Sequence, residues 1–148
     1  MKPVIDDFLN LSYPVDAKIS PNGCRVAYTV RITNWRDNRY ENFCYVFEVA
    51  NNVTTQLTKT GSVTQIRWIN DNDVVVLKNN FDDKKPQVWL YQGLMGDGLQ
   101  LTEHPGGVEA FEAFGEGIIY LANDSERKES RERRESLPRI SLWSMNLP

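Results

Sequence analysis

An internal repeat is the feature of this sequence that most restricts its fold. The segment YVFEVANNVTTQLT (45–58) aligns without a gap with WLYQGLMGDGLQLT (89–102), at an offset of 44 residues. A shorter third copy is PRISLWSMNLP (138–148). A related pair of short apolar segments lies upstream of each copy. The chain of 148 residues therefore contains about three copies of one structural unit.

Each unit is predicted to form four short antiparallel strands. In the second unit, which begins at Val63, the four strands read VTQIRW, DVVVLK, QVWLYQ and LQLTE. Val, Ile, Tyr, Trp and Thr suit strands, whereas the Asn, Asp and Gly residues between them suit tight turns. Gly23 and Gly98 stand at turn positions where a hairpin requires a positive φ.

A four-stranded unit of roughly 40 to 50 residues, repeated in tandem, is typical of a β-propeller, whose blades pack against one another face to face. We therefore predict an all-β fold that contains an incomplete propeller at residues 15–148. Its blades are expected at 15–58, 63–102 and 108–148, and the third blade lacks its fourth strand.

The segment before the first blade, residues 1–14, is predicted to be a short helical lead-in. Val4, Phe8 and Leu11 have helical spacing in PVIDDFLNL, and two aspartates suit a first helical turn. The same aspartates interrupt the apolar run that a secretory signal needs, and no window is apolar enough for a membrane span. We expect a cytoplasmic protein.

Charge indicates neither a nucleic-acid nor a membrane partner. The net charge is only −3, and 25% of the residues are charged. The most highly charged segment, 123–139, alternates acids with arginines and contains no aromatic residue for stacking on bases. It is predicted to be a solvated loop.

Candidate catalytic and metal-binding residues are few. The single histidine, His104, lies in TEHPGG, which reads as a turn, and the sequence contains no GxSxG nucleophile elbow. The segments NDND (70–73) and FDD (81–83) lack the ligand pattern of a calcium loop. We predict no catalytic residue, no metal site and no cofactor. The aspartates of segments 70–73 and 81–83 are instead expected to stabilise turns.

The cysteines and aromatic residues are interpreted as packing residues. Cys24 and Cys44 are expected to be reduced strand residues, with a disulfide between neighbouring strands as the alternative. Six aromatic residues are predicted to pack between blades, the alternative being a ligand-binding cage. They are Trp35, Tyr40, Phe43, Trp68, Trp89 and Trp143.

The sequence resembles a known family in three places. These are the opening DDFLNLSYPVDAKISPNGCRVAYTV, the QLT that closes the first two units, and the charged ERKESRERRE before LP. Together they resemble the N-terminal propeller of prolyl-oligopeptidase-type serine peptidases, especially the acylaminoacyl-peptidase and dipeptidyl-aminopeptidase branch. The SPNG turn is also similar to turns in TolB-like propellers.

The resemblance implies a propeller of seven or eight blades that acts as a lid on an α/β-hydrolase domain with a Ser-Asp-His triad. This sequence lacks the hydrolase motif, so we expect no enzymatic activity from it, and peptide contacts only within a full-length enzyme. One interpretation is a non-catalytic part of a peptidase propeller. The alternative is a stand-alone TolB-like interaction module.

An incomplete propeller leaves apolar blade faces and a strand edge without neighbours. We therefore expect the isolated chain to self-associate through the open faces of blades one and three and through the unpaired edge of blade three. A pair of three-blade halves that closes a six-bladed ring would bury both open faces.

Overall fold

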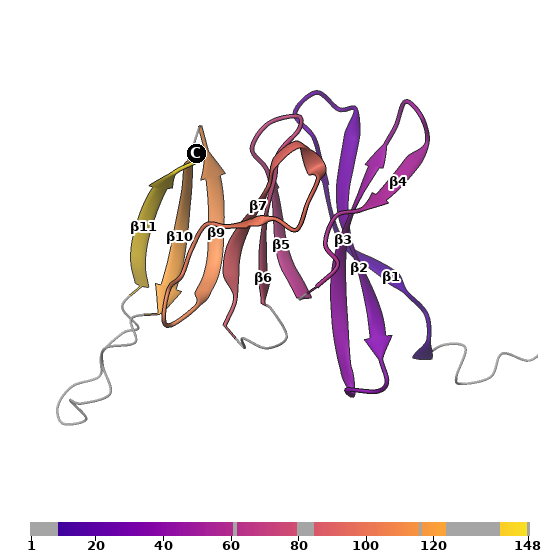
Figure 1. Cartoon of the computed structure of the whole chain (residues 1–148), viewed down its shortest axis with the longest axis horizontal. Helices are drawn as coiled ribbons and strands as arrows, with labels where there is room; N and C mark the ends of the chain where they lie inside the picture. Colours follow the sequence, from indigo (N-terminus) through magenta and orange to yellow (C-terminus); the bar gives the residue numbers. More distant parts are fainter. Residues whose placement is uncertain (1–8, 61, 80–84, 116, 124–139, 148) are drawn as a thin grey trace, which may run out of the picture.

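Three antiparallel sheets stand side by side in the computed structural model of the chain (Figure 1). The structure describes residues 9–60, 62–79, 85–115, 117–123 and 140–147. Within these ranges, the regular elements are eleven strands and one short 3-10 helix. The sheets have four, four and three strands, so the predicted all-β fold with an incomplete third sheet is confirmed.

The strands of each sheet follow one another in sequence order as antiparallel meanders. Sheet one consists of β1 (Tyr13–Ile19), β2 (Arg25–Asn34), β3 (Arg39–Glu48) and β4 (Val53–Gln56). Sheet two consists of β5 (Ser62–Trp68), β6 (Val74–Asn79), β7 (Gln87–Tyr91) and β8 (Leu99–Gln100), with the 3-10 helix η1 (Gln92–Leu94) before β8. Sheet three consists of β9 (Val108–Phe114), β10 (Gly117–Asn123) and β11 (Ile140–Asn146).

Glycines close the hairpins where the backbone turns left-handed. Gly23 has φ +75° and Gly98 has φ +81°, as predicted. At Gly98 the constraint is double, because a Cβ there would lie only 2.7 Å from the ring of Tyr91. Any other residue at this position would strain the backbone and displace a core tyrosine.

The core lies in two layers, one on each face of sheet two. Strand β6 is buried on both faces, so it reads as a continuous apolar run rather than as an alternating pattern. Val74 and Val76 pack toward sheet one, whereas Val75 and Leu77 pack toward sheet three. Because sheet two is covered on both faces, it occupies the position of an inner blade between two neighbours.

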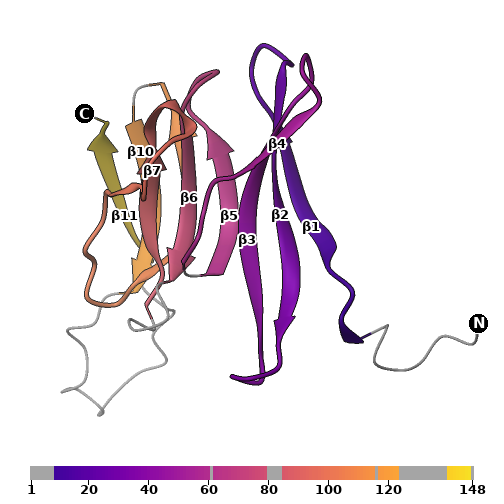
Figure 2. The same cartoon turned by 45° about the vertical axis from the view of Figure 1, so that its right-hand side comes forward.

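Sheet one extends beyond its neighbour at one end. Its central strands, β2 and β3, have ten residues each, whereas β6 has six and β7 has five. Figures 1 and 2 show that the tip of the β2–β3 hairpin reaches past the end of sheet two. Side chains near this tip therefore have no sheet opposite them.

Two sequence-based predictions fall on residues outside the described ranges. These are residues 1–8 of the helical lead-in predicted at 1–14, and residues 124–139 of the charged loop predicted at 123–139. Both parts stay predictions. The described parts differ from the predictions, because Tyr13 and Pro14 already belong to strand β1 and Asn123 is the last residue of β10.

Candidate functional site

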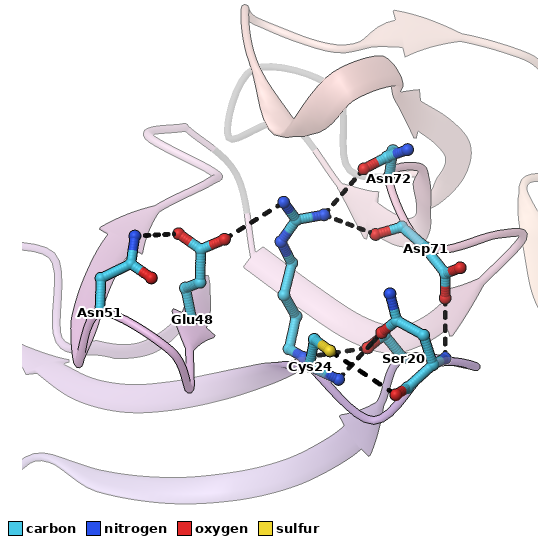
Figure 3. A network of polar contacts seen from close by, with 8 residues as sticks. Ser20, Cys24, Glu48, Asn51, Asp71 and Asn72 are labelled. Atoms are coloured by element: carbon cyan, nitrogen blue, oxygen red, sulfur yellow. Dashed lines mark hydrogen bonds and ion pairs between the residues drawn. The ribbon is translucent and has the colours of Figure 1, made fainter.

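A network of polar contacts joins sheets one and two at the SPNG turn between β1 and β2 (Figure 3). Asn22 organises the turn itself, because its Oδ1 accepts hydrogen bonds from the Ser20 hydroxyl and the Cys24 N–H, both at 2.9 Å. The Ser20 hydroxyl in turn accepts the Arg25 N–H at 3.0 Å. The turn thereby presents the start of β2 to the neighbouring sheet.

The guanidinium of Arg25 is the centre of this network. Its Nη1 donates to the carbonyl oxygen of Asp71 and to Oδ1 of Asn72, each at 2.8 Å. Its Nη2 lies 3.3 Å from Glu48 Oε1 within sheet one. The Asn22 N–H adds a bond of 2.8 Å to Asp71 Oδ1. The donors of Arg25 are used to hold two turns together, so the network fixes the sheets relative to each other.

The acidic segment 70–73 forms the matching turn of sheet two. Oδ1 of Asn70 accepts the N–H groups of Asn72 and Asp73, at 2.7 and 2.9 Å. Asp73 also accepts the Gly93 N–H at 2.8 Å. These side chains serve turns, as predicted, whereas the segment 81–83 lies outside the described residues.

His104 lies in the loop between β8 and β9, as predicted. Its Nδ1 accepts the Gly106 N–H at 3.2 Å, and its carbonyl oxygen accepts Nε2 of Gln87 at 2.9 Å. Its ring centroid is 6.2 Å from that of Trp143. The contacts of His104 thus shape the connection between sheets two and three.

Metal ligands and membrane-spanning helices are two features that the described residues lack. Within those ranges, no group of three or more His, Cys, Asp or Glu residues could hold a metal ion. Among the same residues, no helix has the length and apolar character needed to cross a membrane.

The two cysteines are free thiols in different surroundings. Cys44 lies on β3 and is buried between sheets one and two, as expected for a strand residue. The prediction of a strand residue is wrong for Cys24, which is exposed directly after the SPNG turn, one residue before β2 begins. The structure therefore has reduced cysteines rather than the alternative disulfide. Burial raises the pKa of the Cys44 thiol to about 12, so this thiol stays protonated and unreactive.

A buried lysine lies in the same layer of the core. The ammonium of Lys78 donates to the Tyr91 hydroxyl at 2.9 Å and lies 4.2 Å from the ring centroid of Trp89. Desolvation lowers the pKa of Lys78, and it raises the pKa of Tyr91 to about 12. Lys78 is only 2% exposed, so the lysine is enclosed by the two sheets and out of reach of a substrate.

The aromatic residues divide into packed and exposed groups. Trp68 and Trp89 pack against the layer between sheets one and two, as predicted. Phe43 is buried, but it belongs to neither of the two layers between the sheets. The prediction is wrong for Trp35, Tyr40 and Trp143, which are at least half exposed. Trp35 and Tyr40 lie at the tip of the long hairpin, where no neighbouring sheet covers them.

A groove of about 380 Å³ runs along this hairpin tip. The Trp35 indole N–H donates to Asn10 Oδ1 at 2.6 Å, and the Thr33 hydroxyl donates to the Leu9 carbonyl at 2.9 Å. The groove is lined by apolar and polar side chains: Leu9, Leu11, Tyr13, Thr33, Trp35, Asn38, Arg39 and Tyr40. Sequence reasoning missed the groove, although the extra length of RITNWRDNRYEN relative to the later units marks a longer hairpin.

Arg31 fixes the aromatic side of the groove. Its guanidinium carbon lies 5.8 Å from the ring centroid of Tyr13 and 5.7 Å from that of Tyr40. Its Nε donates to Asn42 Oδ1 at 3.0 Å. A cation between two rings holds both in place.

The outward face of sheet one is apolar. Tyr28 and Tyr45 stack there with ring centroids 5.7 Å apart, at positions that alternate with Ala27 and Val46 on the buried face. Ile19 on β1 is 68% exposed. This face lacks a packed sheet opposite it among the described residues.

The outward face of sheet three has a similar character. A hollow of about 240 Å³ lies at its β9 edge, lined by Ala110, Glu112, Ile119 and Leu121 of this face together with Phe111 and with Gln65 of sheet two. Ile119 and Leu121 alternate on β10 with Ile118 and Tyr120, which pack toward sheet two. Sheets one and three therefore each present one apolar face away from the molecule.

Comparison with known proteins matches this arrangement to solved structures. No protein-family model matches the sequence, and no curated protein matches it either. An acylaminoacyl peptidase bound to Z-Gly-Gly-Phe-chloromethyl ketone has 14% sequence identity and a TM-score of 0.75, over 94% of this chain. The acylaminoacyl peptidase of Pyrococcus horikoshii has 15% identity and a TM-score of 0.70, also over 94%.

The β-propeller domain of the Trilobed protease from Pyrococcus furiosus matches over 91% of this chain and 39% of its own, with 16% identity and a TM-score of 0.65. The chain spans about a quarter of the length of the two acylaminoacyl peptidases, 24% of each. The three sheets thus have the fold of part of the β-propellers in this class of peptidases.

Proposed function

We propose that the chain forms three consecutive blades of a larger, non-catalytic β-propeller of the acylaminoacyl-peptidase type. One observation carries the proposal: all three sheets follow the arrangement of such a protein over 94% of this chain, at a TM-score of 0.75. The single SPNG turn, the two QLT segments and the missing GxSxG motif support it independently. In this proposal the domain gates the access of peptides to a separate hydrolase domain.

The outward faces support a place within a larger ring. Sheet two is covered on both faces, and among the described residues each layer buries a cluster of nine hydrophobic side chains. The outward face of sheet one, which carries Tyr45, and the outward face of sheet three, which carries Leu121, correspond to the sheet faces that pack in these layers. A further blade on each side would bury them, and this burial is the main source of stability in blade packing.

The isolated chain is proposed to self-associate for the same reason. In the pair, the outward face of sheet three of one copy would pack against the outward face of sheet one of the other copy. The sheets would then follow one another around the ring as sheets one, two and three do within one copy. Two copies would close a six-bladed ring, which leaves no face open.

Sedimentation equilibrium of three variants tests the association. Tyr45→Glu and Leu121→Glu each place a charge on one outward face, and we expect both to shift the chain toward the monomer. The matched control is Met95→Glu, because Met95 is exposed on the loop before β8, away from both faces. A wild-type chain that remains a single 17.1 kDa species would contradict the self-association.

Two different measurements test the assignment to a peptidase propeller. The coding sequence downstream of Pro148 is expected to encode further blade repeats and then a GxSxG motif. The purified chain is expected not to react with a fluorophosphonate probe, which labels activated serines. Labelling of this chain would overturn the non-catalytic role, and a downstream sequence without blades or hydrolase would favour the stand-alone interaction module.

A further inference from the structure

The sequence contains a single Asn-Gly pair, Asn22 and Gly23 of the SPNG turn. An asparagine that precedes glycine is prone to deamidation, because glycine has no Cβ to hinder the attack of its own backbone nitrogen on the asparagine side chain. Both residues are exposed, and a Cβ at Gly23 would meet no neighbouring atom within 4 Å. Water and base can therefore reach the pair from solvent.

Deamidation at this pair would proceed through a cyclic imide. The backbone nitrogen of Gly23 loses its proton to a solvent base and forms a bond to Cγ of Asn22. The Cγ–Nδ2 bond then breaks, and the side-chain nitrogen takes up a proton and leaves as ammonia. One water molecule opens the resulting succinimide ring. Opening at Cγ gives aspartate, whereas opening at the backbone carbonyl carbon gives isoaspartate, whose main chain runs through the former side chain and is one carbon longer.

The folded turn opposes this attack at both reacting groups. The Gly23 N–H donates to the Ser20 carbonyl at 2.9 Å, and this bond must break before the nitrogen can act as a nucleophile. Oδ1 of Asn22 accepts the Ser20 hydroxyl and the Cys24 N–H, both at 2.9 Å. Ring closure requires the side chain and the backbone of Asn22 to turn together, and these bonds resist that movement.

The contact with sheet two holds the turn in this protected state. The Asn22 N–H donates to Asp71 Oδ1 at 2.8 Å, and Nη1 of Arg25 donates to the Asp71 carbonyl oxygen, also at 2.8 Å. The backbone on both sides of Gly23 is thereby attached to another sheet. Because the turn can distort only when these bonds open, the rate of deamidation should follow the local opening of the contact.

The turn of sheet two provides an internal comparison. Oδ1 of Asn70 accepts the N–H groups of Asn72 and Asp73, so Asn70 has the same turn-forming role as Asn22. The residue that follows Asn70 is Asp71, whose side chain hinders ring closure. Deamidation is therefore expected at the turn of sheet one and not at that of sheet two.

We propose that Asn22 is a latent modification site, which the contact between sheets one and two keeps unreacted. When this contact opens, Asn22 deamidates. The isoaspartate product prevents the turn from reforming, because its longer main chain displaces Cys24 and Arg25 from their partners. The aspartate product keeps an oxygen at the Oδ1 position and is tolerated. The site thus converts a transient separation of two blades into a permanent chemical change, whether or not the propeller belongs to a peptidase.

Incubation of the folded chain at mildly alkaline pH tests the proposal. Deamidation at each asparagine is followed by peptide mapping and mass spectrometry, with a thiol reductant present. The unstructured reference is the peptide ISPNGCRVA, which copies residues 19–27. We expect Asn22 to deamidate at least about tenfold more slowly in the folded chain than in the peptide, while Asn70 stays intact. Equal rates in the chain and the peptide would overturn the proposal.

Variants that open the contact provide the second measurement. Asp71→Ala removes the acceptor of the Asn22 N–H, and Arg25→Met removes the side-chain bonds to sheet two. Each is expected to raise the rate at Asn22 by about two- to tenfold, as the loss of one or two hydrogen bonds predicts. The matched control is Glu112→Gln, which removes an ion pair from the other contact and should leave this rate unchanged. Should Arg25→Met not fold, Asp71→Ala decides the question.

The products test the permanence of the change. Isoaspartate is identified by methylation of its α-carboxyl group with a protein isoaspartyl methyltransferase, and the modified chain is separated by ion exchange. We expect this chain to have a lower Tm than the unmodified chain, whereas Asn22→Asp should keep Tm close to the wild-type value. An isoaspartate form as stable as Asn22→Asp, or a rate that Asp71→Ala does not raise, would contradict the proposal.

Discussion

The two contacts between neighbouring sheets have the same architecture but different chemistry. The contact between sheets one and two encloses ionisable groups, Cys44, Lys78 and Tyr91, and is closed at one end by Arg25. The contact between sheets two and three is built from Val, Leu, Ile, Ala, Phe and one tyrosine, and its polar groups lie at the margin. The repeat thus preserves the positions of the backbones while the side chains between them differ.

At the margin of the contact between sheets two and three, the side chain of Gln65 forms the hydrogen bonds that a neighbouring strand would otherwise form. The Gln65 amide donates to the Phe111 carbonyl at 2.6 Å and accepts the Phe111 N–H at 3.2 Å. It therefore satisfies both backbone groups of one residue on the inner edge of sheet three. In the first contact, the Trp68 indole makes one comparable bond, to the Lys18 carbonyl at 2.8 Å. Strand β5 of sheet two is thus hydrogen-bonded to the first strand of each neighbouring sheet, through Trp68 to β1 and through Gln65 to β9.

The largest effect is expected from Phe111→Ala, which breaks the second contact. Phe111 is 2% exposed, and its removal leaves a cavity between sheets two and three. We expect a loss of about 3 to 5 kcal/mol in the free energy of unfolding, measured by chemical denaturation. Phe114→Ala is the control, since Phe114 is half exposed and should cost far less. Similar losses for both variants would show that the second contact is not a packed core.

Alkaline pH should weaken the first contact through Cys44. The unfolded thiol ionises near its ordinary pKa of 9.0, whereas the folded thiol stays protonated up to about 12. The unfolded state then binds fewer protons, so stability falls as pH rises from 9 toward 12, by up to about 1.4 kcal/mol per pH unit. Thermal unfolding across this range should show a shallower decline for Cys44→Ala. The exposed Cys24→Ala should leave the slope unchanged.

Arg25→Met should loosen the first contact at its polar end. The change removes three bonds from a half-buried guanidinium and leaves Glu48 and Asp71 without this partner. We expect a loss of about 1 to 2 kcal/mol. Combined with Phe111→Ala, the loss should be additive to within about 0.5 kcal/mol, because the two residues lie in different contacts. Strong coupling in this double-mutant cycle would contradict the independence of the two contacts.

The smallest effect is expected from Glu112→Gln at the margin of the second contact. Glu112 forms an ion pair with Arg67, and the hydrogen bond from Arg67 lowers its pKa. A lowered carboxylate pKa stabilises the fold above the ordinary value of 4.5, and this contribution disappears as pH falls through the lowered pKa. The Glu112 side chain is 65% exposed, so we expect less than about 0.5 kcal/mol, further reduced by salt. A larger loss at neutral pH would show that the pair supports the contact.

The sheets could be predicted because each depends on local sequence. A 44-residue offset, turn residues at fixed places and short apolar segments specify a meander without any knowledge of its neighbours. The exposed aromatics could not be predicted in the same way. Alternation assigns Tyr40 to a face of its strand, but whether that face is covered depends on the length of the strands opposite. Here β3 has ten residues and β7 only five, so the end of β3 that carries Tyr40 extends past sheet two.

The Arg25 network lay beyond sequence reasoning for a related reason. Arg25 and Asp71 are 46 residues apart, and nothing in either segment specifies their contact. A usable signal was nevertheless present, because SPNG and NDND occupy the same turn in successive units. Equivalent turns of adjacent blades lie side by side, so a cation in one and acceptors in the next could have been paired.

The sequential order of strands within each sheet has a consequence for biosynthesis. Every sheet uses only consecutive strands, so sheet one is complete as soon as Gln-Leu-Thr at 56–58 has left the ribosome. The first sheet can then serve as a template on which the second assembles, and the second as a template for the third. Translation and folding would advance together, one blade at a time, and besides the outward face of sheet one the growing protein would expose only the apolar face of its most recently formed sheet.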